Sequence, residues 1–314
     1  MMEDEEIYDL LIKRGAREGS KPSVVRIPNQ LVDEALASAP ETAFLADRRG
    51  GGHTAGGDSE SRFWTGAAMS YLDSDGFRRI NRRELADFSR VIDALPNVDV
   101  IVGTAMADIT ARHGDFIGLR TMATNTDKPI RALSFSPRGG EALIEMGQVL
   151  AQGTPLRDRP VFSVGFTAHG PLRWTALALS VFKSTSGHRI PCTVNGEPMG
   201  GASAPVTLAG TAAVGTAEIL SGIVVNQLLE PGRPCLFNLG FAHVMDMRAG
   251  FAVTGGPENV LLAVAGAELA RYYGLPSVSW MCSDSLEYDS HNALEKSVAA
   301  LAPAPAGVRP AWGV

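Results

Sequence analysis

From residue 98 onward the chain repeats one pattern of apolar and polar positions. A short apolar or β-branched run is followed by a loop rich in Gly, Pro, Ser or Asn, and then by a longer amphipathic or Ala-rich segment. This alternation predicts strands and helices in turn, and strands without polar alternation indicate a parallel sheet covered by helices. The predicted strands are VDVIVGT (98–104), PIRALSF (129–135), PVFSVGF (160–166), IPCTVN (190–195), PCLFNLG (234–240), PSVSWM (276–281) and RPAWGV (309–314).

The clearest predicted helix is LAGTAAVGTAEILSGIVVNQLL (208–229), which is apolar nearly all round and is stopped by Pro231 and Gly232. A helix of that composition is expected to be buried on several sides. The fold class that fits best is α/β, in the form of a TIM (β/α)₈-type barrel, with a doubly wound sheet as the alternative. Residues 1–97 are richer in charge and turns and predict an N-terminal extension or cap, in which RRGGGHTAGGDSESR (48–62) is expected to be a mobile loop.

Composition narrows the function classes. The 314 residues are 45% hydrophobic, which is enough for a sizeable core, and a net charge of -6 with a pI near 5.6 gives no basic field for nucleic acid. We find no apolar run near the ~20 residues that span a bilayer, and the N-terminus is acidic, so we expect no membrane segment and a cytoplasmic location. Cys192, Cys235 and Cys282 form an odd set without a C-x-x-C motif and are expected to be reduced thiols.

Polar residues gather where predicted strands end. The stretch SWMCSDSLEYDSHNALEK (279–296) leaves a strand and at once presents a thiol, hydroxyls, acids and a histidine. In a barrel the loops after the strands share one face, so this loop and those at 167–175, 194–210 and 237–250 are expected to line one pocket. Cys282 lies at the mouth of such a pocket, although a buried small hydrophobe is the commoner role for cysteine.

Other signals stay open between two interpretations. Gly200 and Gly201 precede a long helix whose N-terminus could hold an anion, or the glycines only permit close packing. Asp284 and Asp289 suit either a helix cap or a cation. No two histidines have H-x₃-H or H-E-x-x-H spacing, so no metal site is predicted. Side chains that could form an aromatic wall for a quaternary ammonium group, or else pack in the core, are Trp64, Tyr71, Phe166, Trp174, Phe237 and Trp280.

Several long motifs carry a resemblance to a known family. They are GGASAPVTLAGTAAVGTAEILSGIVVNQLLEPGRPC (200–235), FAHVMDMRAG (241–250), YYGLPS (272–277) and CSDS with DSHNALEK (282–296). With VVRIPNQLVDEALASAP, DALPNVDV, NTDKPI and GPLRWTALAL, they make the chain similar to trimethylamine and quaternary-amine (glycine betaine-like) methyltransferases over nearly all of residues 7–314.

The resemblance implies a TIM-barrel enzyme that moves a methyl group from a methylated amine to the cobalt of a corrinoid on a separate protein. The chain itself is expected to bind no cofactor, because it lacks the D-x-H-x-x-G pattern of corrinoid proteins. Cys282 matches the position of pyrrolysine in the trimethylamine branch, so the resemblance points to the branch without pyrrolysine and to a quaternary amine such as a betaine. A homo-oligomer is left open.

Residue roles follow from position in the predicted fold and from the match at Cys282, and the resemblance also implies a missing part. Cys282 and Asp284 stand at the catalytic positions, Trp64, Phe166 and Trp174 are expected as cage walls, and His169 as a further substrate contact. The groups expected to orient a carboxylate are His291, Asn238, Gly200 and Gly201. The family continues beyond the last strand, so we expect residues 98–314 to form a barrel that lacks its last unit and leaves an edge unpaired. The alternative function is an inactive homologue that binds an amine or acts as a scaffold.

Overall fold

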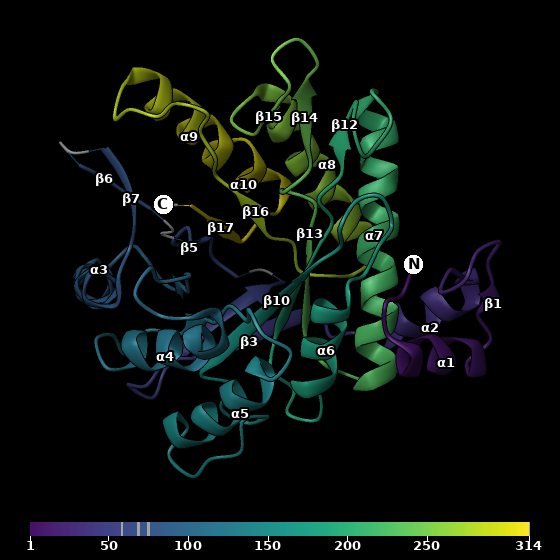
Figure 1. Cartoon of the computed structure of the whole chain (residues 1–314), viewed down its shortest axis with the longest axis horizontal. Helices are drawn as coiled ribbons and strands as arrows, with labels where there is room; N and C mark the ends of the chain where they lie inside the picture. The colour runs from purple at the N-terminus through teal and green to yellow at the C-terminus, as the bar shows by residue number, and fades with distance from the viewer. Residues whose placement is uncertain (58, 68–69, 74–75, 314) are drawn as a thin grey trace.

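The computed structural model describes residues 1–57, 59–67, 70–73 and 76–313, without the side chains of Tyr71 and Asp73. Helices and parallel strands alternate along most of the chain, which confirms the α/β class (Figure 1). The described helices are α1 (Glu5–Lys13), α2 (Asn29–Ser38), α3 (Arg82–Ala94), α4 (Ala111–Ala123), α5 (Gly139–Leu150), α6 (Ala176–Ser184), α7 (Leu208–Leu229), α8 (Pro257–Tyr272), α9 (Ser290–Leu301) and α10 (Pro303–Ala306).

Two parallel sheets form the centre of the molecule. One has the strand order β13-β11-β10-β9-β8 and the other the order β16-β17-β5. Their strands are β5 (Arg62–Trp64), β8 (Ile101–Val102), β9 (Ile130–Arg131), β10 (Phe162–Thr167), β11 (Cys192–Asn195), β13 (Cys235–Asn238), β16 (Ser279–Trp280) and β17 (Pro310–Trp312). Each strand run predicted from residue 98 onward contains or overlaps one of these strands, so those predictions are confirmed.

The two sheets are joined at both of their ends. Isolated parallel bridges connect Trp64 with Val100 and Phe237 with Ser277. Backbone hydrogen bonds of 3.0 and 3.1 Å run across the two junctions. The end strands of the two sheets therefore lie next to each other at both junctions.

Strand β5 comes from the N-terminal part of the chain, where no central strand was predicted. Phe63 pairs with Ala311 in β17, and β17 pairs on its other side with β16. The unpaired edge expected beside residues 309–314 is therefore not found in the described chain. The run RFW has only three residues and follows a polar stretch. Its hydrophobic pattern therefore does not predict a strand.

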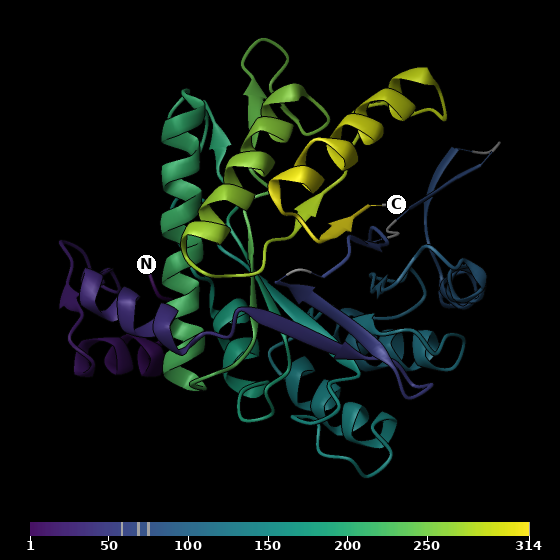
Figure 2. The same ribbon diagram turned by 180° about the vertical axis from the view of Figure 1, so that it is seen from behind.

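The segment predicted as a mobile loop is in part a strand. Strand β4 (Gly52–Gly56) pairs antiparallel with β3 (Thr42–Ala46), and the hairpin is drawn in violet in Figure 2. Its residues Ala43, Leu45 and Ala55 are buried in one apolar cluster with Leu236 of β13 and with Val278, which immediately precedes β16. Gly52 and Gly56 let the two backbones pair closely, because a Cβ at either position would overlap a carbonyl oxygen of the facing segment. Backbone pairing of this kind leaves no apolar pattern in the sequence.

The remaining strands lie outside the two parallel sheets. They are β1 (Arg17–Glu18), β2 (Val25–Arg26), β6 (Ser70–Asp73), β7 (Gly76–Arg79), β12 (Met199–Gly200), β14 (His243–Asp246) and β15 (Phe251–Val253). The last three form a small sheet in the order β12-β14-β15. Figure 1 shows this sheet beyond β13, on the side of the molecule where α7 begins.

Helix α7 has the bounds that the sequence predicted, Leu208–Leu229, and it contacts α1, α2, α6 and α8 as well as β11. By length and composition it could cross a membrane, so the expectation that the chain has no such run was wrong. Half of its most apolar window is buried inside the protein, as in a core helix. Gly222 permits the close approach, because a Cβ there would overlap Trp174 and Val194.

Candidate ligand-binding cavity

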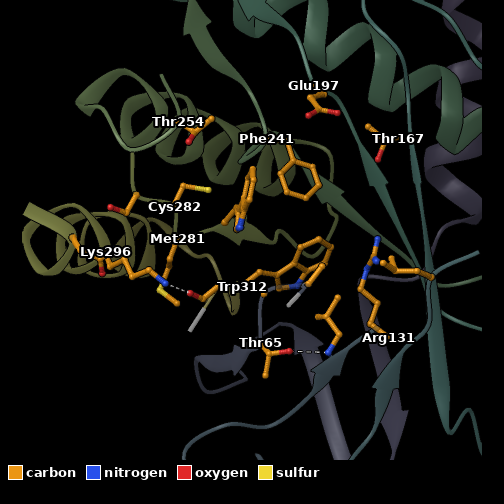
Figure 3. A pocket seen from close by; sticks show the side chains of 18 residues that line it. Thr65, Arg131, Thr167, Glu197, Phe241, Thr254, Met281, Cys282, Lys296 and Trp312 are labelled. Carbon is orange, nitrogen blue, oxygen red and sulfur yellow. Dashed lines mark hydrogen bonds between the residues drawn. The ribbon is translucent and has the colours of Figure 1, made fainter. Parts of the chain in front are cut away.

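A cavity of about 600 Å³ opens at the carboxyl ends of the parallel strands (Figure 3). Side chains at or just beyond the strand ends line it, together with residues of α9. The lining residues at successive strand ends include Thr65, Thr167, Glu197, Phe241, Met281 and Gly313. The prediction that loops after separate strands converge on one pocket is therefore confirmed.

Three aromatic rings form one wall of the cavity. The Phe241 ring stands edge-on to Trp280 and to Trp312, with centroid distances of 4.8 and 5.6 Å. Trp64 stacks against Trp312 at 5.4 Å and lies behind it, outside the lining. Aromatic rings at such angles offer π-electron density to a permanent cation, which is attracted to ring faces within about 6 Å.

Glu197 supplies negative charge beside this wall. It follows β11, and Figure 3 shows Phe241 between Glu197 and Trp312. Burial raises the pKa of the Glu197 carboxyl, and the charges of His243 and His169 act in the opposite direction. The His243 Nδ1 atom lies 2.7 Å from the carbonyl oxygen of Phe241, which ties this histidine to the aromatic wall.

Two cationic side chains also line the cavity. The Arg131 guanidinium lies over the Trp312 ring, 4.6 Å from its centroid, and burial lowers its pKa to about 10. Lys296 reaches in from α9, and its Nζ donates a hydrogen bond of 2.6 Å to the Gly313 carbonyl. Arginine and lysine on different elements therefore bring positive charge to separate parts of the lining.

Cys282 is one of the predicted catalytic residues, and it does line the cavity. Burial raises the pKa of its thiol, although the charge of Lys296 acts in the opposite direction. The thiol is therefore protonated at neutral pH, and a thiol is a far weaker nucleophile than a thiolate. Its position supports a role in shaping the cavity.

Asp284, the second predicted catalytic residue, is held in a loop contact. Its carboxylate accepts hydrogen bonds from the backbone N–H and hydroxyl of Thr254 and from the Gly255 N–H, at 2.8 to 3.0 Å. It thereby positions Thr254, which lines the cavity. Asp289 is the N-cap of α9, where it accepts from the backbone N–H of Asn292.

The predicted His291 lies outside the cavity lining. Its side chain is 57% exposed, and Nε2 lies 2.8 Å from Glu295 on the same helix. Asn292 and Lys296, four residues apart on α9, face the cavity instead. Helix α9 therefore lines the cavity with the face that carries Asn292 and Lys296, which is next to the face that carries the predicted His291.

The other predicted cage walls pack in the core. Phe166 stacks on Phe182 at 3.5 Å, and Trp174 stands edge-on to Phe182 at 5.5 Å while its indole N–H donates to Ser221. Phe237 is also fully buried. Phe166, Phe182 and Trp174 form an aromatic cluster, and Phe237 packs near Tyr273, all away from the cavity lining. The side chain of Tyr71 lies outside the described residues.

The residues predicted to orient a carboxylate also lie away from the lining. The Gly201 N–H, next to the buried Gly200, donates to the Ala204 carbonyl within its own turn, and His169 is exposed. Asn238 is fully buried but connected to the site through two hydrogen bonds. Its amide donates to Asn195 at 2.8 Å, and the Asn195 amide donates to Thr167 at 3.0 Å.

Sequence reasoning missed several lining residues. They are Thr167, Glu197, Phe241, Lys296, Trp312 and, above all, Arg131. Arg131 lies inside the otherwise apolar predicted strand PIRALSF, and a charge within a buried strand is the signal that could have found it. Among the residues that the structure describes, no group of three or more His, Cys, Asp or Glu side chains could hold a metal ion.

Fold and cavity together define the class of this chain: an α/β protein with a pocket for a small molecule at the carboxyl ends of its parallel strands. Comparison with known proteins identifies the family. The profile of the trimethylamine methyltransferase (MTTB) family matches residues 1–312, and the chain belongs to that family.

Relatives with assigned activities are consistent with this membership. The chain is 31% identical to a trimethylamine methyltransferase of Desulfitobacterium hafniense over 281 residues, and 30% identical to one of Methanosarcina barkeri over 321 residues. It is 27% identical to a glycine betaine methyltransferase of Desulfitobacterium hafniense over 279 residues. These alignments cover 88%, 99% and 87% of this chain but only 56%, 65% and 58% of the relatives, so the chain spans less than two thirds of their length.

The fold is also similar to a solved structure. The monomethylamine methyltransferase of Methanosarcina barkeri superposes with a TM-score of 0.68, over 99% of this chain and 66% of that protein. The sequence identity of 14% limits this likeness to the fold.

Proposed function

We propose that this chain is a methyltransferase that takes a methyl group from a quaternary amine and passes it to the cobalt of a corrinoid on a separate protein. The observation that carries the proposal is the aromatic wall of Phe241, Trp280 and Trp312 with Glu197 beside it, because this combination attracts a permanent cation. Membership in the MTTB family supplies the reaction class. A cavity of about 600 Å³ is in the range of small-molecule sites.

The chemistry favours a quaternary substrate. The methyl carbon accepts an electron pair from cobalt(I), the C–N bond breaks, and its electron pair stays on nitrogen, so that a neutral tertiary amine leaves. A neutral amine such as trimethylamine would have to leave as an amide anion unless it were first activated. Cys282 stands where the pyrrolysine branch has its activating residue, and its protonated thiol supplies no comparable group.

We also propose that the fold is a (β/α)₈-type barrel. The parallel bridges at both junctions between the two sheets support this, as does the location of the cavity at the carboxyl ends of the strands. The cytoplasmic location is part of the same proposal, because reduced corrinoid is stable only in a reducing compartment. The corrinoid-carrying partner and homo-oligomerisation stay predictions.

The test is methyl transfer to free cob(I)alamin, followed by the appearance of methylcobalamin in the absorption spectrum. We expect methylcobalamin with glycine betaine or a related quaternary amine and none with trimethylamine. Phe241→Ala should slow the reaction, and Leu177→Ala, an exposed residue on α6, is the matched control. Transfer from trimethylamine would refute the substrate class, and binding of quaternary amines without any transfer would favour the amine-binding alternative.

A further inference from the structure

Arg131 combines burial with a place in the cavity wall. Its side chain is on β9, where the residue is 5% exposed, and its guanidinium stacks on Trp312. Buried arginines normally have carboxylate or carbonyl partners, because the guanidinium carries five N–H donors and a charge that loses its hydration. The partners of Arg131 therefore show whether its site is complete without a ligand.

The site is incomplete. The only hydrogen bond of the guanidinium with the described residues runs from Nη2 to the Thr193 hydroxyl, at 3.3 Å. Nε is buried without a partner, and so is the indole N–H of Trp312, the ring on which the guanidinium lies. No carboxylate of the described residues forms an ion pair with Arg131, and burial alone accounts for its lowered pKa. At a pKa of about 10 the group still carries its charge at neutral pH.

The neighbouring strand makes room for this charge. Gly165 on β10 faces the guanidinium, and a Cβ at this position would overlap Nη2. Thr167, two residues further along β10, points to the same side of the sheet and lines the cavity. Its oxygen accepts from the Asn195 amide, so its hydroxyl proton is free to donate to a ligand. A guanidinium and a hydroxyl donor therefore face the same part of the cavity.

We propose that Arg131, assisted by Thr167, binds the carboxylate of the substrate, so that the cavity selects zwitterionic betaines over quaternary amines without a carboxylate. This inference rests on the proposed function for the cationic end of the ligand. The planar guanidinium suits a carboxylate in a two-pronged contact, and the ligand would supply the acceptor that the protein withholds. Trp312 would join the two ends, because it contacts both Arg131 and Phe241.

Lys296 is the competing cation in the cavity and provides the matched control. Its Nζ already donates to the Gly313 carbonyl, and it approaches from α9, on the side of Cys282 (Figure 3). If general positive charge attracted the carboxylate, Lys296→Met and Arg131→Met would weaken binding to similar extents. If Arg131 forms the specific contact, only Arg131→Met has a large effect.

The experiment is calorimetric titration of the full chain with three ligands. Glycine betaine has both charges, 3,3-dimethylbutyrate has the same shape with the carboxylate only, and tetramethylammonium has the cation only. In Arg131→Met we expect about a 30-fold or greater loss of affinity for both carboxylate ligands, because a charge-assisted bidentate contact is lost. Tetramethylammonium should bind within about twofold of the wild-type affinity, as should all three ligands in Lys296→Met.

Gly165→Ala is a second variant that reaches the same group from a different strand. The added methyl displaces the guanidinium, so the loss should again be confined to the carboxylate ligands. Thermal unfolding of both variants, followed by circular dichroism, shows whether they are folded.

Three results would overturn the inference: wild-type chain that binds neither carboxylate ligand, unchanged carboxylate affinity in folded Arg131→Met, or a larger loss in Lys296→Met. A different result would refute the proposed function while leaving this inference intact. If tetramethylammonium does not bind while 3,3-dimethylbutyrate binds in an Arg131-dependent manner, the cation site is refuted and the carboxylate site stands.

Discussion

Two buried arginines in this protein are placed next to aromatic rings, but their surroundings differ. Arg233 is fully buried, and its guanidinium donates to the carbonyls of Ile190 and Phe182 and to the Thr185 hydroxyl. Arg131 has one long hydrogen bond, to the Thr193 hydroxyl. The protein therefore satisfies one guanidinium internally and leaves the other to be completed from the cavity.

The two aromatic clusters differ in the same way. Phe166, Phe182 and Trp174 fill space between β10, α6 and α7, and the Trp174 N–H has a partner in Ser221. Phe241 and Trp280 are only partly buried, because they face the cavity. Residue type alone does not separate structural from functional groups here, whereas the presence or absence of internal partners does.

The largest expected effect is on the free energy of unfolding, which should respond differently to loss of the two arginines. Arg233→Met should lower the free energy of unfolding by about 3 to 5 kcal/mol, because it leaves buried acceptors unpaired. Arg131→Met should leave it unchanged or raise it. Burial lowers the Arg131 pKa from 12.5 to about 10, so at neutral pH the charged form costs the folded state up to about 3 kcal/mol. Urea unfolding of both variants measures the difference, and equal losses would contradict it.

Stability and ligand affinity, measured on the same variants, distinguish the core aromatic cluster from the aromatic wall of the cavity. Trp174→Ala should cost about 3 to 5 kcal/mol of stability. In the fraction that remains folded, the affinity for tetramethylammonium should be unchanged.

Phe241→Ala should weaken binding of tetramethylammonium by roughly 2- to 30-fold, since one cation–π contact is worth about 0.5 to 2 kcal/mol. It should destabilise the fold less than Trp174→Ala does. Calorimetry and urea unfolding measure the two quantities, and a binding loss specific to Trp174→Ala would reverse the assignment of the clusters.

The pH dependence of binding tests whether the Glu197 carboxylate is the counter-charge of the bound cation. Burial raises the pKa of this carboxyl above its ordinary value, so it takes up a proton at a higher pH than an exposed glutamate does. Affinity for tetramethylammonium should therefore fall as the pH falls through the raised pKa, because the cation loses its counter-charge. Glu197→Gln should bind weakly at all pH values and remove this dependence. An unchanged pH profile in Glu197→Gln would assign the titration to another group.

The smallest expected effect concerns Cys282. Its thiol is buried and protonated at neutral pH, so Cys282→Ser should change the methyl-transfer rate by less than about twofold. Measurements at neutral pH with saturating betaine test this. A loss of several hundredfold would show that the thiol takes part in the chemistry.

Much of the architecture could be predicted from the sequence, and the reason is periodicity. Strands β8 to β11, β13, β16 and β17 and helix α7 are long or apolar enough for their pattern to be visible. Strand β5 and hairpin β3–β4 depend on backbone pairing between distant segments, which leaves little pattern. The convergence of the loops was predictable from the same alternation.

The composition of the cavity was less predictable, because it depends on which way each side chain faces. Cys282 was found since it directly follows the predicted strand PSVSWM, whereas His291 was chosen instead of its neighbour Asn292, one residue further around the helix. Trp174 and Phe166 were chosen as aromatic residues near strand ends, although both pack against Phe182. Only the three-dimensional packing distinguishes a ring that faces a cavity from one that faces a helix.

The central claim is that the cavity holds a betaine with its two ends at different partners. A crystal structure of the chain with saturating glycine betaine tests it most directly. We expect the ammonium group within about 6 Å of the Phe241 and Trp280 ring centroids and the carboxylate against the Arg131 guanidinium. Ligand density beside Trp174, or a carboxylate bound to Lys296 with Arg131 still uncontacted, would contradict it.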